Sequence, residues 1–419
     1  TLEELGLLKM DFLGLRTLTV IQNAVLLARR KQPELNINQI DYNDQKVLDY
    51  IGTGKTDGVF QLESAGMKGF MKELKPHNLE DVIAGISLYR PGPMDFIPQY
   101  IRGKNDSSSI TYDCPQLEPI LAPTYGCIVY QEQVMQIVRD LAGYSLGRSD
   151  LLRRAMSKKK AAVMEKERKI FIYGDEETGV PGCIKNGIDE QTANKIYDEM
   201  IDFAKYAFNK SHAAAYAVVS YQTAWLKYYF PVEYMAALMT SVIDNPSKVS
   251  EYIYACRQMN IKILPPDINK GEANFSVDGG DIRYGLAAIK SIGRPVIKAI
   301  VEDREELGLF QNLEDFITRL SAKNILNKRT IENLIKAGAL DTLGGTRKQF
   351  MSIYVQIVDH VTQEKKNSMV GQMTLFDLVS EDQKEDFQIR MPDVGEYSKE
   401  TLLAFEKEVL GTYVSGHPL

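Results

Sequence analysis

Hydrophobic residues recur at helical spacing along much of the chain. Four of them fall on one helical stripe between residues 131 and 142: Val134, Ile137, Val138 and Leu141. Such a stripe is typical of a helix that faces a core. The pattern changes at residues 263–286, where a Pro-Pro pair is followed by Gly279-Gly280 between short apolar runs. A Gly-Gly pair in that setting favours a tight β-hairpin. The chain is therefore predicted to be mainly α, with one small β element.

Positive charge is concentrated in the predicted helical run 150–169. This run holds eight basic residues against three acidic ones, although the whole chain has a formal charge of −6. Arg154 and Lys158 are four residues apart and therefore share one face of a helix. Further along, Lys210 and His212 lie among small residues, which let a ligand approach closely. Because Arg, Lys and His are donors to phosphate oxygens, the region is a candidate phosphate site. A solvated helix face is the alternative.

An apolar run near the start of the chain contains one carboxylate. Asp11 lies within residues 7–15, which are otherwise mostly apolar, and a buried carboxylate is costly unless it is paired or bound to a metal. In one interpretation Asp11 is the N-cap of a helix that continues through Val20. In the other, Asp11 ends a strand and binds a divalent cation, with Lys9 on the same face of that strand. Periodicity does not choose between them.

Two stretches contain glycine in positions that predict turns. Residues 51–60 read IGTGKTDGVF, but the GxxxxGK[ST] pattern needs Gly at position 49, where the chain has Asp49. A nucleotide-binding P-loop is therefore excluded, and a turn is predicted. A Pro-Gly-Pro sequence follows Arg90 and imposes a rigid turn. Arg90 is expected to project from a fixed corner, either as a ligand contact or as an ordinary surface charge.

The sequence after residue 285 contains two candidate helix-hairpin-helix turns. Short predicted helices flank Ser-Ile-Gly at 291–293, and a similar shape recurs at 334–338. In such hairpins the glycine turn presents backbone N–H groups and a helix N-terminus to a DNA phosphate, without reading bases. A neutral helical hairpin is the alternative. The paired occurrence favours contact with the DNA backbone.

The chain from Glu364 onward is predicted to be loosely structured. Its one apolar cluster, residues 372–376, reads QMTLF between polar flanks. An isolated apolar plug in a flexible segment is typical of a docking peptide, in which Leu375 and Phe376 fill a pocket and Gln372 fixes the register. A short helix that folds back on its own domain is the alternative.

Length and composition set outer bounds on the protein. At 419 residues and 44% hydrophobic, the chain is expected to form about two to four domains. There is no run of about 18 apolar residues that would span a membrane. Four cysteines are widely spaced, without a CxxC or a nearby His pair: Cys114, Cys127, Cys183 and Cys256. They are predicted to be reduced thiols, and a zinc site is not supported. Because the chain opens at Thr1 without an initiator Met, we interpret it as a fragment.

Nine sequence segments together resemble one known family. They are KMDFLGLRTLT, VFQLES, YRPGPM, YQEQVM, LLRRAMSKKK, FNKSHAAAYA, SYQTAWLK, PPDIN and LGTYVSGHPL. These segments are long, distinctive and spread over nearly the whole chain. The chain therefore resembles the alpha subunits of bacterial DNA polymerase III, the C-family replicative polymerases.

The resemblance implies a mainly α fold with a large helical fingers domain, a remnant of a polymerase-β-like palm and a small helix-hairpin-helix unit. The implied domains are residues 1–20 (end of the palm), 21–275 (fingers), 276–365 (helix-hairpin-helix unit) and 366–419 (clamp-binding peptide and linker toward a downstream domain). The family has three catalytic aspartates that bind two Mg²⁺ ions. Asp11 matches the last of them and would be both catalytic and a metal ligand, while the other two would precede Thr1.

The implied activity is template-directed DNA synthesis, in which a primer 3′-OH attacks the α-phosphate of a deoxynucleoside triphosphate (dNTP). The residues implied for dNTP binding are Lys9, Arg90, Arg153, Arg154, Lys210 and His212. Those implied for DNA binding are Lys158, Lys159, Lys290 and Gly293. Gln372, Leu375 and Phe376 match the family's pentapeptide for the β sliding clamp. The other implied partners are primer-template DNA and further replicase holoenzyme subunits, in the cytoplasm and away from membranes.

The two absent aspartates lead us to expect that this segment is inactive alone, although its full-length parent would be a DNA-directed DNA polymerase. The alternative belongs to a different class, a non-catalytic DNA-binding scaffold built on helix-hairpin-helix units and a clamp peptide. The discriminating feature is the set of cations between Asp150 and His212, because a scaffold does not need a triphosphate groove.

Overall fold

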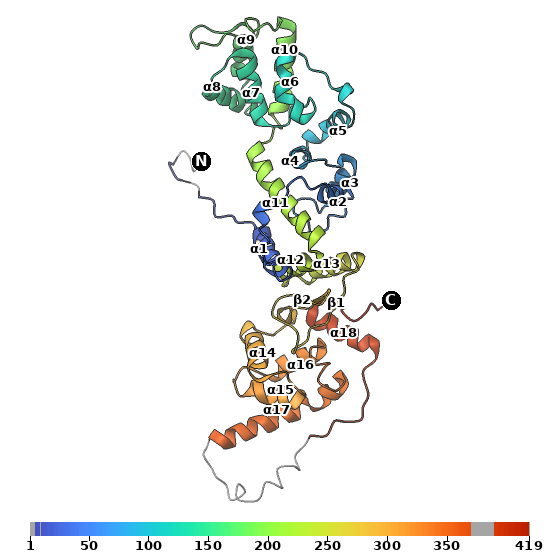
Figure 1. The fold of residues 1–419 in the computed structure, drawn as a ribbon. Coiled ribbons are helices and arrows are strands. Elements are labelled where there is room, and N and C mark those ends of the chain that lie inside the picture. The colour runs from blue at the N-terminus through green and yellow to red at the C-terminus, as the bar shows by residue number, and fades with distance from the viewer. Residues whose placement is uncertain (1–4, 9, 370–388, 419) are drawn as a thin grey trace, which may run out of the picture. The chain divides into compact units, whose positions relative to one another are not determined.

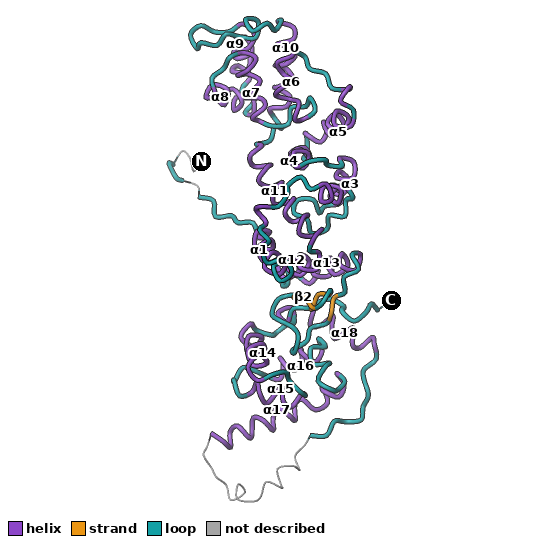
Figure 2. Tube along the Cα trace, viewed as in Figure 1, coloured by secondary structure: helices purple, strands orange, loops and turns teal. Residues whose placement is uncertain are grey.

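The computed structural model describes residues 5–8, 10–369 and 389–418, and the chain divides into two compact units (Figure 1). One unit combines Thr1–Leu35 with Tyr229–Leu419, and the other is Asn36–Tyr228. Helices dominate both units (Figure 2). The strands within the described ranges form a single three-stranded sheet. The prediction of a mainly α protein with one small β element is confirmed.

The unit Asn36–Tyr228 is helical throughout. Its α-helices are α2 (Gln45–Gly52), α3 (Ala65–Leu74), α4 (Leu79–Leu88), α5 (Ile97–Asn105), α6 (Glu118–Leu121), α7 (Gln131–Ala142), α8 (Leu146–Ser157), α9 (Ala161–Tyr173), α10 (Glu190–Ala204) and α11 (Lys210–Tyr229). Short 3-10 helices lie at η1 (Ile37–Gln39), η2 (Pro93–Phe96), η3 (Ser107–Ser109), η4 (Pro115–Leu117) and η5 (Ala122–Thr124). The helix predicted at 131–142 and the turn predicted after residue 51 are both confirmed.

Short polar side chains begin many of these helices. The side chains of Asp44, Ser64, Asn78, Ser145 and Asp189 each accept a hydrogen bond from a backbone N–H in the first turn of α2, α3, α4, α8 and α10. These N–H groups have no partner within the helix, so the caps fix where each helix starts.

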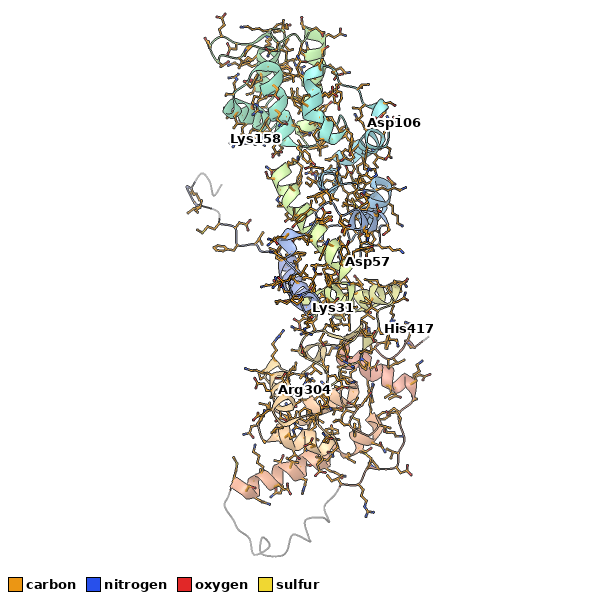
Figure 3. All side chains as sticks on the ribbon, in the orientation of Figure 1. Lys31, Asp57, Asp106, Lys158, Arg304 and His417 are labelled. Atoms are coloured by element: carbon orange, nitrogen blue, oxygen red, sulfur yellow. The ribbon has the colours of Figure 1, made fainter. Side chains whose placement is uncertain are left out.

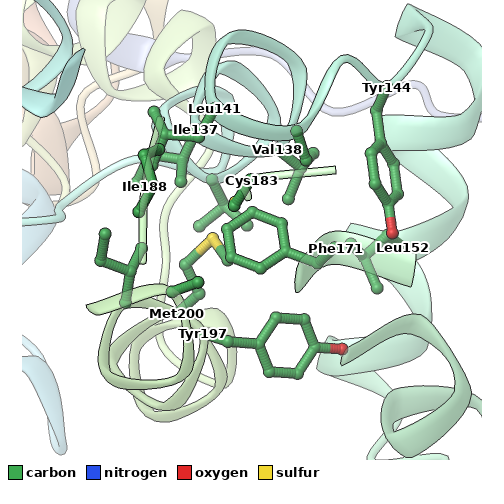
Figure 4. Packing of buried hydrophobic residues seen from close by; sticks show 14 of the residues in the cluster. Ile137, Val138, Leu141, Tyr144, Leu152, Phe171, Cys183, Ile188, Tyr197 and Met200 are labelled. Carbon is green, nitrogen blue, oxygen red and sulfur yellow. The ribbon is translucent and has the colours of Figure 1, made fainter. Parts of the chain in front are cut away.

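Two hydrophobic clusters hold this unit together. The first joins α7, α8, α9 and α10, and Figure 4 shows Phe171 of α9 between the α7 side chains and Tyr197 of α10. The ring centroids of Phe171 and Tyr197 lie 5.5 Å apart. The second cluster joins α2, α3 and α4 to α11, around fully buried residues such as Leu48, Met71 and Tyr221. The two clusters therefore fix the loops that precede α7 and α11.

The other unit contains α1, the sheet and the helices from α12 to α18. Its α-helices are α1 (Arg16–Ala28), α12 (Pro231–Ser241), α13 (Pro246–Gln258), α14 (Arg294–Leu307), α15 (Leu313–Ser321), α16 (Lys328–Lys336), α17 (Arg347–Met369) and α18 (Lys399–Leu410), with a 3-10 helix at η6 (Leu286–Ala288). The strands β1 (Ile263–Leu264), β2 (Ser276–Asp278) and β3 (Asp281–Arg283) pair in the order β1-β3-β2. β2 and β3 are antiparallel around Gly279-Gly280, so the predicted hairpin is confirmed.

Two short helices flank the turn at residues 291–293, as predicted: the 3-10 helix η6 precedes it and α14 follows it. One local prediction for this unit is wrong. The loose structure predicted from Glu364 onward fails for the described residues, because α17 continues to Met369 and α18 packs against α16. Leu403, Val409 and Leu410 of α18 are buried, which gives this helix a core to join.

Candidate functional site

Arg90 is held at the corner that follows α4. Its Nε donates to the carbonyl oxygen of Ser87 at 3.0 Å, and its Nη2 donates to the carbonyl oxygen of Tyr206. The guanidinium carbon lies 4.4 Å from the centroid of the Phe208 ring. Burial lowers the pKa of Arg90. The predicted fixed corner is confirmed, and it fastens Arg90 to the segment that precedes α11.

Arg153 and Arg154 share one carboxylate on α8. Arg153 Nη2 lies 2.7 Å from Oδ1 of Asp150, and Arg154 Nη2 lies 2.8 Å from its Oδ2. The hydrogen bond from Arg153 is the main reason that the pKa of Asp150 is below its usual value. The Arg153 side chain is 19% exposed, whereas that of Arg154 is 61% exposed. Arg154 therefore presents its charge to solvent, while Arg153 is held against the protein.

Gln131 connects Arg153 to the same segment that Arg90 contacts. Its Oε1 accepts from Arg153 Nη1 at 3.3 Å, and its Nε2 donates to the carbonyl oxygen of Ala207 at 3.3 Å. Two backbone hydrogen bonds join the segments: Gln131 N–H donates to Phe208 at 2.9 Å, and Phe208 N–H donates to Val129 at 3.1 Å. The residues Val129–Gln131 and Tyr206–Phe208 thus form a two-segment platform.

Lys210 begins α11 beside this platform. Its Nζ lies 3.3 Å from Oε2 of Glu80 and 5.3 Å from the centroid of the Tyr130 ring. Its backbone N–H donates to the Glu132 carboxylate at 3.0 and 3.2 Å. Arg90, Arg153 and Lys210 come from three separate stretches, and all three contact the platform or its flanking residues. We call these three residues with Arg154 the cation cluster.

His212 and the lysines after α8 lie next to the cation cluster in the chain. The His212 ring centroid is 5.5 Å from that of Phe208 and 4.4 Å from that of Tyr216. Lys158 is the C-cap of α8 (labelled in Figure 3), and its N–H donates to the carbonyl oxygen of Arg154 at 3.0 Å. Lys159 follows with a positive φ of 54°. Both lysines are exposed.

Several residues of the site were not singled out from the sequence. Glu80, Gln131, Glu132 and Asp150 hold the cations, but hydrophobic periodicity gives no signal for polar groups that meet across the fold. The YQEQVM segment marked the right stretch without indicating that Gln131 would link two segments. The link forms only when the fold brings Gln131 beside Ala207 and Arg153.

Asp11 lies in a different unit from the cation cluster. It is in neither a helix nor a strand, since α1 begins at Arg16 with Leu15 as its N-cap. The N-cap interpretation is therefore wrong, and Asp11 does not end a strand, while its binding of a divalent cation stays a prediction. Its Oδ1 accepts from the backbone N–H of Leu13 at 2.9 Å, and the residue is exposed. Lys9 lies outside the described residues.

A metal site is not complete in the part of the chain that the structure describes. Those residues contain no group of three or more His, Cys, Asp or Glu side chains that could hold a metal ion. Asp11 alone supplies one carboxylate, whereas Mg²⁺ takes near-octahedral oxygen coordination. The residues present therefore do not fit a Mg²⁺ site by themselves.

The predicted DNA-binding turn lies between η6 and α14. Gly293 is the N-cap of α14 and carries no side chain to cap it, and no acidic residue lies in the first turn. Lys290 is exposed, while its backbone N–H donates to Val409 at 2.8 Å and its carbonyl oxygen accepts from Asn333 at 2.7 Å. The helix N-terminus at 293–296 is thus open to an anion. Gln372, Leu375 and Phe376 lie outside the described residues.

Comparisons with known proteins identify relatives of the chain. Residues 17–179 match the bacterial DNA polymerase III alpha subunit finger domain, and residues 260–350 match a helix-hairpin-helix motif. The whole chain aligns at 44% identity with DNA polymerase III subunit alpha of Borreliella burgdorferi, Thermus aquaticus and Escherichia coli K12, over 418, 423 and 430 residues.

The chain is related to the DNA polymerase III alpha subunits. The resemblance predicted from the sequence is confirmed. The chain covers 36%, 33% and 36% of these three relatives, so it spans about a third of the length of the curated relatives it matches. Among helices in the described ranges, none combines the length and the hydropathy that a membrane span requires.

Proposed function

We propose that this chain supplies the nucleotide- and DNA-binding fingers of a replicative DNA polymerase. One observation carries the proposal. Arg90, Arg153 and Lys210, from three separate stretches, contact one two-segment platform, with Arg154 exposed beside them. A surface whose charges were only solvated would not need this convergence. The relatedness to DNA polymerase III alpha subunits supplies the reaction, transfer of a nucleotide to a primer 3′-OH.

The cation cluster has the chemistry that a dNTP triphosphate needs. Guanidinium groups bind phosphate oxygens in pairs, and Lys adds a point charge. In the structure, Asp150 pairs with the two arginines of α8, and Glu80 pairs with Lys210. A polyphosphate carries more charge than a single carboxylate and would compete for Arg154 first, because that side chain is the most exposed. We place His212 at the margin of this site.

The reaction also needs groups that this chain does not provide by itself. We propose Asp11 as one carboxylate of a Mg²⁺ site, completed by residues outside this chain, with Lys9 beside it. We therefore propose that the chain alone does not extend a primer.

Three further roles follow from the same relationship. We propose that Lys158 and Lys159 contact the DNA backbone in the fingers, and that Lys290 and Gly293 contact it at the helix-hairpin-helix turn. We propose residues 372–376 as the peptide that binds a sliding clamp, alongside other replicase subunits. The division into palm end, fingers, helix-hairpin-helix unit and clamp segment is part of this proposal, as is a cytoplasmic location.

Steady-state kinetics of the full-length polymerase would test the nucleotide site. Arg154→Ala should raise the KM for dNTP or lower kcat, because a cation that meets the triphosphate is lost. Lys185→Ala is the matched control, since Lys185 is exposed and lies outside the cluster. Unchanged kinetics for Arg154→Ala would contradict the site and favour a non-catalytic DNA-binding scaffold.

A further inference from the structure

An open groove of about 500 Å³ lies between the C-terminal part of α3 and the helix α5. Its lining residues are Lys72, Glu73, Lys75, Ile97, Pro98, Ile101 and Arg102. We call it the α3–α5 groove. It shares no lining residue with the cation cluster. The groove is therefore a separate surface from the cation cluster.

The floor of the groove is aliphatic and fixed. Ile97 belongs to the hydrophobic cluster around α2–α4, and Ile101 packs against the same cluster. Pro98 is exposed between them and lies in the first turn of α5. Because both isoleucines are anchored from below, the floor keeps its shape and offers apolar surface to an incoming side chain.

The rim of the groove carries a surplus of positive charge. Lys72, Lys75 and Arg102 are exposed, and none forms an ion pair with another residue in the described ranges. Glu73 is the single acidic residue of the lining. A fourth cation, Lys104, donates from Nζ to the carbonyl oxygen of Lys75 at 2.9 Å, so it braces the rim.

Helix dipoles explain only part of this arrangement. Lys72 lies in the last turn of α3 and Arg102 in the last turn of α5, where cations interact favourably with helix C-termini. That effect does not require the two helix ends to meet around an apolar floor. Like charges gathered there repel one another more strongly than in open water, because the floor lowers the local dielectric. An anionic occupant would remove this repulsion.

We propose that the α3–α5 groove binds a short acidic segment of a partner protein. An apolar side chain of that segment lies on Ile97, Pro98 and Ile101, while its neighbouring carboxylates face Lys72, Lys75 and Arg102. Because the groove is small and has only seven lining residues, we expect a weak, transient interaction, with a Kd on the order of micromolar. Its affinity falls as salt rises, since the charged rim is solvent-exposed.

A peptide fits this surface better than a nucleic acid does. Sequence-tolerant binding of single strands uses aromatic rings on which bases stack. The lining of the α3–α5 groove contains no aromatic residue. Aliphatic side chains beside cations instead match a segment that alternates carboxylates with Leu or Phe.

Fluorescence anisotropy on the full chain would test the proposal. The probe is a fluorescein-labelled Asp-Asp-Leu-Phe-Asp-Asp peptide, compared with a variant in which Ser replaces Leu and Phe. Lys75→Glu with Arg102→Glu should weaken binding at least about tenfold, by the loss of two charge contacts. Lys185→Glu with Lys366→Glu makes the same change in net charge at exposed sites elsewhere and should leave the affinity within about twofold.

The outcomes separate the possibilities. Equal loss in the two charge-reversal pairs would show a non-specific charge effect and overturn the proposal. Equal binding of the Leu-Phe and Ser-Ser peptides would overturn the role of the apolar floor. An oligodeoxythymidylate of similar charge that binds more tightly than the peptide, and loses affinity with Lys75→Glu and Arg102→Glu, would assign the groove to nucleic acid. Because all four substituted cations are exposed, unchanged circular dichroism is expected for both pairs.

Discussion

Arg347 and Glu406 form a buried ion pair between the start of α17 and the middle of α18. Arg347 Nη1 lies 3.3 Å from Oε1 of Glu406, and the two side chains are 6% and 0% exposed. Oε2 of Glu406 accepts from the backbone N–H groups of Val414 and Ser415 at 3.0 Å each. This carboxylate therefore ties α18 and the residues after it to α17.

Removing Glu406 should destabilise this unit strongly. We expect Glu406→Ala to lower the free energy of unfolding by about 3 kcal/mol, because the buried Arg347 would keep only Asp341 as an ion-pair partner within the described ranges and two backbone N–H groups would lose their acceptor. Glu408→Ala is the control, since Glu408 is 57% exposed and pairs with Lys336, and it should cost less than about 1 kcal/mol. Hydrogen exchange of the α18 amides would measure both. Similar protection in the two variants would contradict this account.

Glu199 should make the stability of the unit Asn36–Tyr228 depend on pH. It lines a cavity of about 330 Å³ with Asp113, Lys195 and Asp202. Burial, and then the charge of Asp113, raises the pKa of Glu199 from 4.5 to about 7. The folded state therefore binds a proton that the unfolded chain releases, and the stability from neutral Glu199 is lost as pH rises from 4.5 to about 7.

Glu199→Gln should flatten that dependence, because the amide stays neutral. Melting temperatures at about pH 5 and about pH 8 would show a smaller decrease for the variant than for the parent chain. Glu176→Gln, at an exposed position, should behave like the parent. Parallel decreases in parent and Glu199→Gln would rule out Glu199 as the titrating group.

Gly92 should be intolerant of any side chain. Its φ is +99°, and a Cβ there would lie 2.6 Å from the ring of Tyr206. We expect Gly92→Ala to cost about 1–3 kcal/mol from backbone strain, with a further loss as Tyr206 moves away from Arg90. Gly179→Ala isolates the backbone effect, because Gly179 has φ +70° but open space around its Cβ. Urea unfolding would show a greater loss for Gly92→Ala, and equal losses would exclude a role for the Tyr206 contact.

Both oxygens of the Asp81 side chain should be needed as hydrogen-bond acceptors, because three donors point at them. Its Oδ1 accepts from the hydroxyls of Tyr100 and Tyr125 at 3.1 Å each, and its Oδ2 accepts from the His77 backbone N–H at 2.8 Å. Asp81→Asn would turn an NH₂ group toward one of these donors and cost about 2–3 kcal/mol. Tyr125→Phe removes one donor and should cost about 1 kcal/mol. Thermal unfolding that ranks them in the opposite order would contradict this network.

Local features were predictable because their causes are local. The stripe in α7, the hairpin at Gly279-Gly280 and the corner after Arg90 follow from periodicity and from the backbone limits of Gly and Pro. The start of α1 was not predictable, because its N-cap residue, Leu15, has no side chain that accepts a hydrogen bond from the first turn of the helix. Asp11, four residues earlier, was therefore a plausible but wrong cap.

Long-range partners were beyond prediction from one sequence. Arg90 and Tyr206 are 116 residues apart, and only the packing of two hydrophobic clusters brings them together. The family resemblance placed Arg153, Arg154 and Lys210 in one site, but it did not indicate that Asp150 and Gln131 hold the arginines. Likewise, the ion pair that joins α18 to α17 links Glu406 and Arg347, which are 59 residues apart.

The paired backbone hydrogen bonds between Val129–Gln131 and Phe208 have a mechanical consequence. They join the segments that precede α7 and α11, so the two segments are expected to move together. Arg90, Arg153 and Lys210 all contact this two-segment platform, so we expect a displacement of any one of them to shift the other two. A single pair of spin labels, one of them beside the platform, would then report a displacement of all three residues.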